Sequence, residues 1–327
     1  MQRLSVVIPN YNYAQFVGAA IDSALALRWS DVEVVVVDDG STDQSLDIIR
    51  GYGDRISLLA TENATQRVAC NRGFAASTGD VVVFLDSDDV LPPDLPIPLA
   101  EAMGPTVSKV QFQMQRMDES GTPQGDPFPT YDPVPPPTDI RRWLLATSAY
   151  PTPPGSGNAY ARWFLDQILP VGPEVGDAGD SALLAAAPLL GDVVSVSGVL
   201  VGYRQHGRND SDLLRDVSRF AREVTRARDR WRFALAADRR PADDRPLFAS
   251  RELLQLRVAA HRLAPQAATL PGDRPVRMLL DALRSPFRPG PDRWGHRCAL
   301  AGWSMLTLLV PGRFARQLVQ LRYGRTP

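Results

Sequence analysis

The sequence predicts an α/β protein, with a mainly parallel central sheet flanked by helices and an α-helical C-terminal appendage. Over residues 4–90, short runs of β-branched residues alternate with stretches whose apolar positions recur at helical spacing. This alternation is typical of βαβ units, whose strands run parallel and whose crossovers are right-handed. From about Leu213 the strand patterns stop and Arg-rich helical stretches follow. We therefore expect an α/β domain over residues 1–212 and an Arg-rich helical region over residues 213–327.

In the N-terminal part, each strand is predicted from a continuous apolar run and each helix from apolar positions three or four residues apart. Ser41 or Thr42 is a candidate N-cap for the second helix. In chain order, the expected elements are a strand at 4–8, a helix at about 14–27, a strand at 32–37, a helix ending near residue 50, a short strand at 56–59, a helix at 66–77 and a buried strand at 81–85.

The pattern is less regular after Pro92. Residues 107–117 alternate and predict an antiparallel strand, whereas residues 122–137 are rich in Pro and Gly and predict a surface loop. The remaining expected elements are a helix at 141–146, a small-residue loop entering a short strand at 156–160, a helix at 180–190, strands at 193–196 and 199–203, and helices at 213–235 and 247–263.

The composition is that of a globular protein able to bury a core, with 44% hydrophobic and 22% charged residues. The two cysteines, Cys70 and Cys298, lie far apart in the sequence, which argues against a disulfide scaffold and favours a reducing compartment. Met1 leads directly into a strand-like run, so no secretory signal is expected. These features predict a cytoplasmic protein.

Charge is distributed unevenly along the chain. Residues 1–214 contain 27 acids and 13 Lys+Arg, a net charge of −14, and residues 215–327 contain 10 acids and 23 Arg, a net charge of +13. The apolar segment Cys298–Val310, flanked by arginines, is too short to span a bilayer. It is consistent with peripheral contact at the inner face of a membrane, or with a helical bundle whose Arg face is solvated.

Three carboxylates end the central strand: Asp86, Asp88 and Asp89 directly follow the apolar run 81–85. Like charges clustered at a strand end repel one another, and a divalent cation with a phosphate would compensate them. Mg²⁺ and Mn²⁺ prefer such oxygen ligands, and ligands of open α/β sheets bind at the carboxyl ends of the strands. The alternative is a polar turn that caps the next helix.

The order of the motifs resembles family 2 glycosyltransferases with the GT-A fold, a Rossmann-like architecture. The likeness covers residues 4–90 and becomes looser to about residue 210. It is carried by Val6-Val7-Ile8-Pro9-Asn10-Tyr11-Asn12, Val35-Val36-Val37-Asp38-Asp39-Gly40-Ser41-Thr42-Asp43, Asn71-Arg72-Gly73, Gly79-Asp80 and Phe84-Leu85-Asp86-Ser87-Asp88-Asp89.

The resemblance implies a role for each of these strand ends. Asp39 would contact a uracil-type base, Asp86 the ribose side of the nucleotide, and Asp88 the metal. Pro9 and Tyr11 would shape the base pocket, although core packing is an alternative for Tyr11. The nucleotide-sugar site would also include Asn12 and Asn71. Asp38 is expected only to orient its loop, and Asp89 to cap a helix or support a ligand.

Members of the resembled family invert the anomeric centre, which requires a general base for the acceptor hydroxyl. The family carries this base as the Asp of a Glu-Asp pair that opens a helix. Here Asp180 occupies that place, while Gly179 replaces the Glu. Asp177 is therefore an alternative base, and two further alternatives are that activity is weakened or lost, or that Asp180 only caps its helix.

The segment Tyr203-Arg204-Gln205-His206-Gly207 also resembles the end of the family's catalytic domain. His206 would complete the metal shell or contact the diphosphate, and Arg204 is a candidate phosphate partner by its charge. Cys70 stands where the family often has Arg, and Arg67, on the same helical face, is a candidate substitute.

Together these features predict an inverting glycosyltransferase that uses Mn²⁺ or Mg²⁺ and a nucleotide-diphosphate sugar, with a UDP-sugar favoured. The acceptor would be a glycan or a lipid-linked glycan, as in polysaccharide or cell-envelope biosynthesis. The competing hypothesis is a non-catalytic nucleotide-sugar-binding or scaffold protein of a glycan assembly complex. A nucleotidyltransferase is disfavoured because residues 8–18 lack a Gly-rich phosphate loop, and no nucleic-acid partner is expected because no recognition module is visible.

Overall fold

The computed structural model describes residues 1–176, 180–207, 214, 216–267 and 269–324. By its contacts the chain divides into two compact units. The first contains residues 1–140, 151–207 and 237–239, and the second contains residues 141–150, 208–236 and 240–327. The division passes through α5 (Pro137–Thr147).

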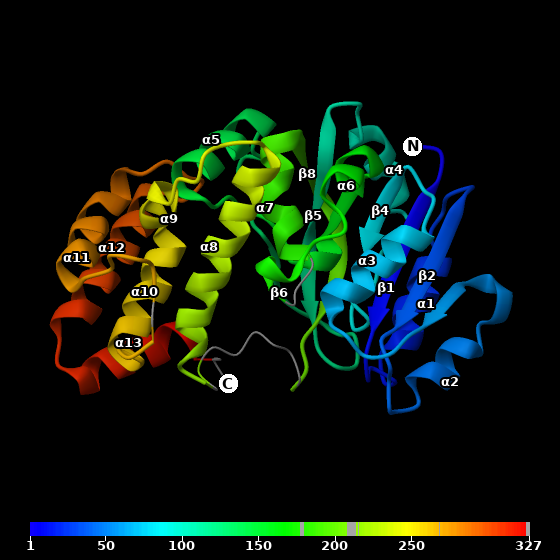
Figure 1. The fold of residues 1–327 in the computed structure, drawn as a ribbon, viewed down its shortest axis with the longest axis horizontal. Helices are drawn as coiled ribbons and strands as arrows, with labels where there is room; N and C mark the ends of the chain where they lie inside the picture. The colour runs from blue at the N-terminus through cyan, green and yellow to red at the C-terminus, as the bar shows by residue number, and fades with distance from the viewer. Residues whose placement is uncertain (177–179, 208–213, 215, 268, 325–327) are drawn as a thin grey trace. The chain divides into compact units, whose positions relative to one another are not determined.

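The first unit is built on one mixed sheet, with strand order β3-β2-β1-β4-β7-β5-β6 and β8 paired to β5 (Figure 1). The parallel half consists of β3 (Ser57–Ala60), β2 (Val32–Asp38), β1 (Leu4–Asn10) and β4 (Val81–Phe84). The other half contains β7 (Asn158–Ala161), β5 (Val107–Met117), β6 (Pro123–Phe128) and β8 (Asp192–Arg204). The predicted α/β fold is confirmed, and the carboxyl ends of β1, β2 and β4 meet at one edge of the sheet.

Helices cover both faces of the parallel half of the sheet, and successive strand residues pack against opposite helices. Leu4, Val6 and Ile8 pack in the same core cluster as the buried residues of α1 (Val17–Leu25). On the opposite face, Gly73 of α3 (Gln66–Ala76) approaches Val7 so closely that an added Cβ would lie 2.3 Å from its Cγ1. Successive strand residues point to opposite faces, so β1 is buried on both sides.

Two strand predictions need correction. Residues 122–137, predicted to be a loop, contain β6, which pairs with β5 across a bulge near Gly125. An edge strand tolerates such Pro and Gly content because only one side of it makes ladder hydrogen bonds. The strands predicted at 193–196 and 199–203 are one strand, β8, and its register shift coincides with the positive φ of Gly198.

The helices of the first unit largely follow the sequence pattern. The second helix, α2 (Ser45–Arg50), is not capped by Ser41 or Thr42 as expected; instead Asp43 accepts a hydrogen bond from the backbone N–H of Ser45 at 2.9 Å. The pattern did not identify α4 (Pro96–Ala102) or α6 (Arg162–Ile168), and α7 (Asp180–Leu190) has the predicted bounds.

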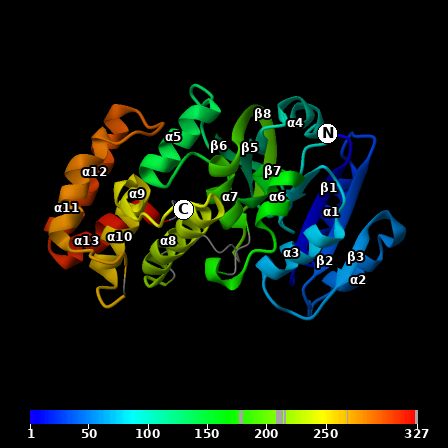
Figure 2. The same ribbon diagram turned by 45° about the horizontal axis from the view of Figure 1, so that its top comes forward.

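The second unit is helical. The helix predicted at 213–235 is α8 (Arg219–Ala237), and the one predicted at 247–263 is split into α9 (Arg245–Ala249) and α10 (Arg251–Leu263), because Ser250 caps α10 through the backbone N–H of Leu253. The unit continues with α11 (Pro275–Arg284), α12 (Trp294–Leu309) and α13 (Gly312–Tyr323), whose order along the chain can be followed in Figure 2. Among the described residues, no helix combines the length and apolarity needed to cross a membrane.

Candidate active site

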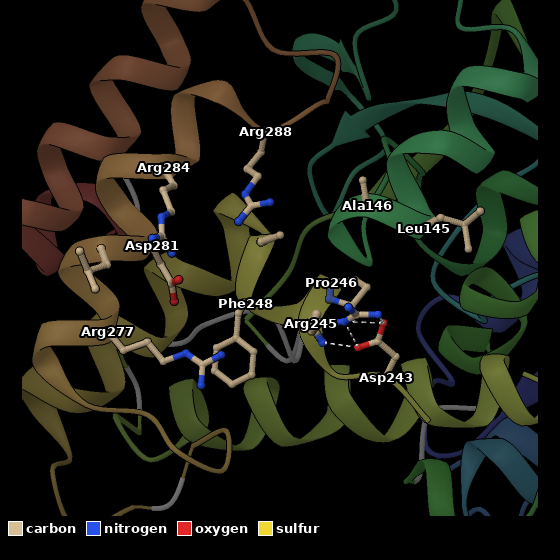
Figure 3. Close-up of a pocket in the computed structure, with 12 residues that line it drawn as sticks. Leu145, Ala146, Asp243, Arg245, Pro246, Phe248, Arg277, Asp281, Arg284 and Arg288 are labelled. Carbon is tan, nitrogen blue, oxygen red and sulfur yellow. Dashed lines mark hydrogen bonds and ion pairs between the residues drawn. The ribbon is translucent and has the colours of Figure 1, made fainter. Parts of the chain in front are cut away.

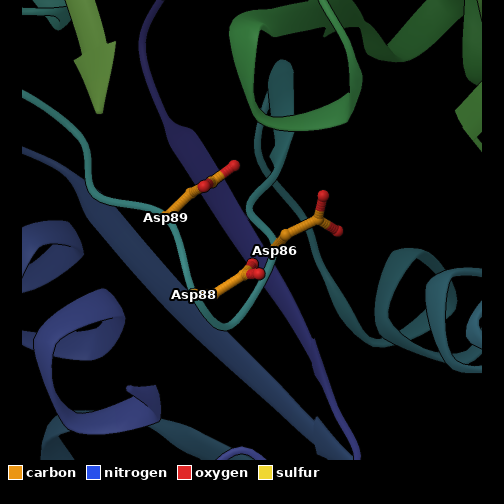
Figure 4. A group of neighbouring side chains, drawn as sticks. All are labelled: Asp86, Asp88 and Asp89. Carbon is orange, nitrogen blue, oxygen red and sulfur yellow. The ribbon is translucent and has the colours of Figure 1, made fainter. Parts of the chain in front are cut away.

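The carboxylates that follow β4 form a cluster. One oxygen from each of Asp86, Asp88 and Asp89 lies within 4.8 Å of the others, on the loop shown in Figure 4. Asp89 is fully buried, and burial together with the neighbouring Asp88 charge raises the pKa of its carboxyl group to about 8. The three carboxylates offer the oxygen donors that Mg²⁺ or Mn²⁺ prefers, and a bound cation would offset the repulsion that raises the pKa of Asp89, so the residues fit a divalent cation.

Asp86 is held from two sides. Its Oδ1 accepts a hydrogen bond of 2.7 Å from Gln66 Nε2, at the start of α3, and its backbone N–H donates to Ser156 Oγ at 3.0 Å. The next residue, Ser87, donates its hydroxyl to the carbonyl of Pro9 at 2.9 Å, which ties this loop to the end of β1. The direction of Asp86 is therefore fixed by groups outside its own loop.

His206 reaches the cluster through Asp88, with its Nε2 at 2.9 Å from Asp88 Oδ2. The imidazole is buried, stacks on the ring of Phe16 at a centroid distance of 4.9 Å, and meets Tyr13 edge-on at 5.7 Å. Two aromatic rings from the segment before α1 thus orient the histidine. The structure brings Asp88 and His206, the two predicted metal ligands, into direct contact.

Arg204 is buried and makes hydrogen bonds to the loop that carries Asp88 and Asp89. Its backbone N–H donates to Asp89 Oδ1 at 3.0 Å, and its Nε donates to the carbonyl of Asp88 at 2.9 Å. One Nη donates to the carbonyl of Glu119 at 2.7 Å, and the guanidinium lies over the ring of Phe16. In this structure the hydrogen bonds described for Arg204 position the loop of Asp88 and Asp89.

Asp39 lies at the end of β2 and is almost fully buried. Both of its carboxylate oxygens accept from the backbone N–H of Ala64, at 3.1 and 3.0 Å, and Arg72 forms an ion pair with it at 3.5 Å. The turn that holds Asp39 leads directly into Gln66, which holds Asp86. The segment between β3 and α3 therefore connects the two predicted nucleotide-binding carboxylates.

The loop after β1 is locked to the loop after β2. Asn12, at a positive φ of 59°, accepts from the backbone N–H of Thr42 at 2.7 Å, and its own N–H donates to Ser41 Oγ. Asp38 accepts from Ser41 and from Asn10 Nδ2, so it orients its loop as expected. Tyr11 is 45% exposed, which rules out core packing for this side chain.

Asn71 and Arg67, one helical turn apart on α3, hold the segment that precedes α7. Asn71 exchanges hydrogen bonds with the backbone of Val171, and Arg67 donates to the carbonyls of Val171 and Gly176. Asp180 is the first residue of α7, and its side chain is not among those described. The alternative base Asp177 and the unusual Gly179 lie outside the described residues.

Gln66 and Ser156 are site residues that sequence reasoning missed. Their contacts with Asp86 join positions 20 and 70 residues apart. Thr65 caps α3 by accepting a hydrogen bond from the backbone N–H of Val68, and Gln66 is the first residue of that helix. The polar side chain of Gln66 at the helix start was the one sequence feature that could have indicated a site residue here.

The fold is the GT-A fold of glycosyltransferases. The structure of S. aureus TarS 1–349 in complex with UDP has a TM-score of 0.56 and covers 96% of this chain and 91% of its own, at 16% identity. The mannosyltransferase PcManGT of Pyrobaculum calidifontis, in complex with GDP-Man and Mn²⁺, has a TM-score of 0.51 and covers 99% of this chain and 88% of its own, at 19% identity.

Residues 5–157 match the family model Glycosyl transferase family 2. An uncharacterized glycosyltransferase of Nostoc sp. is 37% identical over 223 residues, which are 64% of this chain and 66% of that protein. The uncharacterized glycosyltransferase YibD of Escherichia coli K12 is 36% identical over 96 residues, which are 28% of each chain. The chain thus matches just under two thirds of the first relative's length and less of the second's.

Proposed function

We propose that this protein transfers a sugar from a nucleotide-diphosphate sugar, with a UDP-sugar favoured, to a glycan or lipid-linked acceptor, with inversion at the anomeric carbon. The observation that carries the proposal is the cluster of Asp86, Asp88 and Asp89 within 4.8 Å at the tip of the central strand. Two structures of the same fold support the donor class, since TarS was crystallised with UDP-GlcNAc and PcManGT with GDP-Man and Mn²⁺.

Asp88 and His206 would hold a divalent cation, with Asp86 and Asp89 close enough to share it. A cation bound there neutralises charge on the departing diphosphate. Arg204 is also proposed as a phosphate partner, in addition to its contacts with the loop.

Asp39 is proposed to accept a hydrogen bond from the base. A carboxylate can accept about four hydrogen bonds, so the bond from the backbone N–H of Ala64 leaves it able to accept others. Asp86, fixed by Gln66, would accept from the ribose hydroxyls. The exposed ring of Tyr11 would offer a flat apolar wall for the base, and Pro9, near the end of β1, would help to shape the same pocket. Asn12 and Asn71 would maintain the loops around this pocket.

Asp180 is the proposed general base, which takes the proton from the acceptor hydroxyl as the new bond forms. Its place at the start of α7 is supported from α3, since Arg67 and Asn71 bind the backbone of Val171 and Gly176 just before it. Asp177 remains the alternative, and both assignments are proposals.

The test is UDP release from UDP-sugars with Mn²⁺ and a panel of glycan acceptors, measured for wild type, Asp88→Ala and Asp180→Asn. Asp166→Ala, an exposed acid of α6, is the matched control. We expect Asp88→Ala to lose metal-dependent release, and Asp180→Asn to bind UDP but to turn over slowly. Unchanged release in Asp88→Ala would reject the metal role. UDP binding without turnover by the wild type on every donor and acceptor would favour the scaffold hypothesis.

The place of action is also a proposal. We infer a cytoplasmic protein that touches the inner face of the membrane through its basic C-terminal region, because residues 215–327 carry a net charge of +13 and that leaflet is anionic.

A further inference from the structure

The second unit contains a cavity of about 600 Å³ that the proposed sugar transfer does not use. It lies between the C-terminal half of α5, helix α9, helix α11 and the turn that follows α11 (Figure 3). The charged residues of its lining are four arginines and two acids: Arg245, Arg277, Arg284, Arg288, Asp243 and Asp281.

Each acid of the lining forms an ion pair with an arginine. Asp243 forms an ion pair with Arg245 at 2.8 Å. Asp281 accepts from Arg257 at 2.9 Å, and Arg257 is completely buried behind it. Arg257 also pairs with Asp273, so the four arginines of the lining and Arg257 stand against three acids, a net charge of +2. Within the described part of the chain, neither Arg284 nor Arg288 forms an ion pair with a carboxylate.

Arg277 is oriented by an aromatic ring. Its guanidinium carbon lies 3.4 Å from the centroid of Phe248, in a cation–π contact. This stacking uses the face of the guanidinium and leaves its N–H edge as the hydrogen-bonding surface. In Figure 3, Arg284 and Arg288 point from α11 and the following turn toward α9. Planar guanidinium groups gathered in one cavity suit the oxygens of a phosphoryl group.

An apolar stripe adjoins the cavity along α11. Val276, Leu280 and Leu283 of α11 are 68%, 44% and 56% exposed, and Phe287, in the 3-10 turn that follows α11, is 76% exposed; they recur at intervals of four, three and four residues. Leu280 also lines the cavity. Apolar side chains that are exposed on one helix face, rimmed by arginines, are the pattern of a helix that lies at a membrane interface.

We propose that this cavity binds a phosphate monoester or pyrophosphate group of a membrane lipid, whose apolar part lies along the α11 stripe. The guanidinium groups of Arg277, Arg284 and Arg288 would hold the phosphoryl oxygens, and Leu283 and Phe287 would enter the lipid. The site differs in place from the apolar segment Cys298–Val310, and it operates whether or not the first unit transfers sugar.

The test is co-sedimentation of the full-length protein with phosphatidylcholine vesicles that contain or lack phosphatidic acid. The double variant Arg284→Gln/Arg288→Gln is compared with Arg313→Gln/Arg316→Gln, which removes the same charge from exposed positions on α13 outside the cavity. We expect the cavity variant to bind phosphatidic acid vesicles at least tenfold more weakly than wild type, and the control to stay within twofold. Equal losses in the two variants would overturn the proposal, because they would show attraction to net charge alone.

A second pair of measurements distinguishes a lipid head group from a water-soluble anion. Inorganic pyrophosphate binding is measured by calorimetry for wild type, the cavity variant and Leu283→Ser/Phe287→Ser. The lipid proposal expects the Ser variant to keep pyrophosphate binding and to lose vesicle binding. Pyrophosphate binding that requires Arg284 and Arg288, without any vesicle binding by the wild type, would overturn the lipid assignment. UDP release by each variant, expected to be unchanged in the absence of vesicles, reports on the sugar-transfer proposal separately.

Discussion

Replacing Asp86 by Asn is expected to stabilise the metal-free protein. Oxygens of Asp86, Asp88 and Asp89 lie within 4.8 Å of one another. Two unit charges at that distance repel by about 1 kcal/mol in water and by about 3 kcal/mol at an effective dielectric constant of about 20. Because burial and Asp88 raise the pKa of Asp89 to about 8, Asp89 is mostly uncharged at neutral pH, and the Asp86–Asp88 pair dominates. We therefore expect a gain of about 1 kcal/mol, at the low end of that range.

The same substitution should reverse its effect when Mn²⁺ is present. A ligand at 100 times its Kd stabilises the folded state by about 2.7 kcal/mol. The variant loses one anionic oxygen donor and so gains less from the metal, while the amide oxygen still accepts from Gln66 and keeps the loop in place. Wild type should then be the more stable protein.

The measurement is urea unfolding followed by circular dichroism, in EDTA and in saturating Mn²⁺. Asp166→Asn, an exposed acid of α6, is the control for removing a carboxylate and should respond to Mn²⁺ as wild type does. The reasoning is refuted if Asp86→Asn is less stable than wild type in EDTA, or if Mn²⁺ stabilises the two proteins equally.

Substitutions at three further positions test other parts of the structure. Lys109→Met should cost about 3 kcal/mol, because the buried Nζ donates to three side-chain oxygens that would lose their donor. Burial lowers the pKa of Lys109 in the folded protein well below 10.5, its value in the unfolded chain. At pH values between the two, the unfolded chain binds more protons than the folded protein, so the free energy of unfolding of the wild type should rise with pH. Urea titrations of the variant should show no such rise. Gln66→Leu should lower kcat/KM for UDP release about tenfold without changing the melting temperature, because it removes the hydrogen bond from Gln66 Nε2 to Asp86 Oδ1. Arg257→Met should cost about 3–5 kcal/mol in thermal unfolding, because it leaves Asp273 and Asp281 unpaired, and an unchanged melting curve would contradict this.

The parallel half of the sheet was predictable because its signals are local. Each strand is a run of β-branched residues, and Asp86, Asp88 and Asp89 follow one such run directly. Parallel strands place their carboxyl ends at one edge, so grouping these acids needed no knowledge of distant contacts. The contact between Asp88 and His206 was harder, since 118 residues separate them, and it depended on the family resemblance.

What the sequence did not reveal depends on pairing between distant segments. β6 was missed because its Pro and Gly content signals a loop, and only the pairing with β5 makes it a strand. The Arg-lined cavity of the second unit was missed because α11 was not predicted, although its exposed apolar stripe has a clear helical period. The buried side chain of Lys109, the one lysine of the chain, also has its partners 43 and 49 residues away.

One helix connects the two halves of the proposed chemistry. From the start of α3, Gln66 holds Asp86 on the donor side, while Arg67 and Asn71 hold the backbone of Val171 and Gly176 just before α7. A helix is rigid over one turn, so a shift of α3 would move Asp86, the proposed ribose-binding carboxylate, together with the segment before Asp180. Cys70 stands where the resembled family often has Arg, and Arg67, three residues earlier, reaches the segment before α7. The close approach of Gly73 to Val7 sets how α3 packs on β1, so it also sets where Asp86 and the segment before Asp180 lie relative to the sheet.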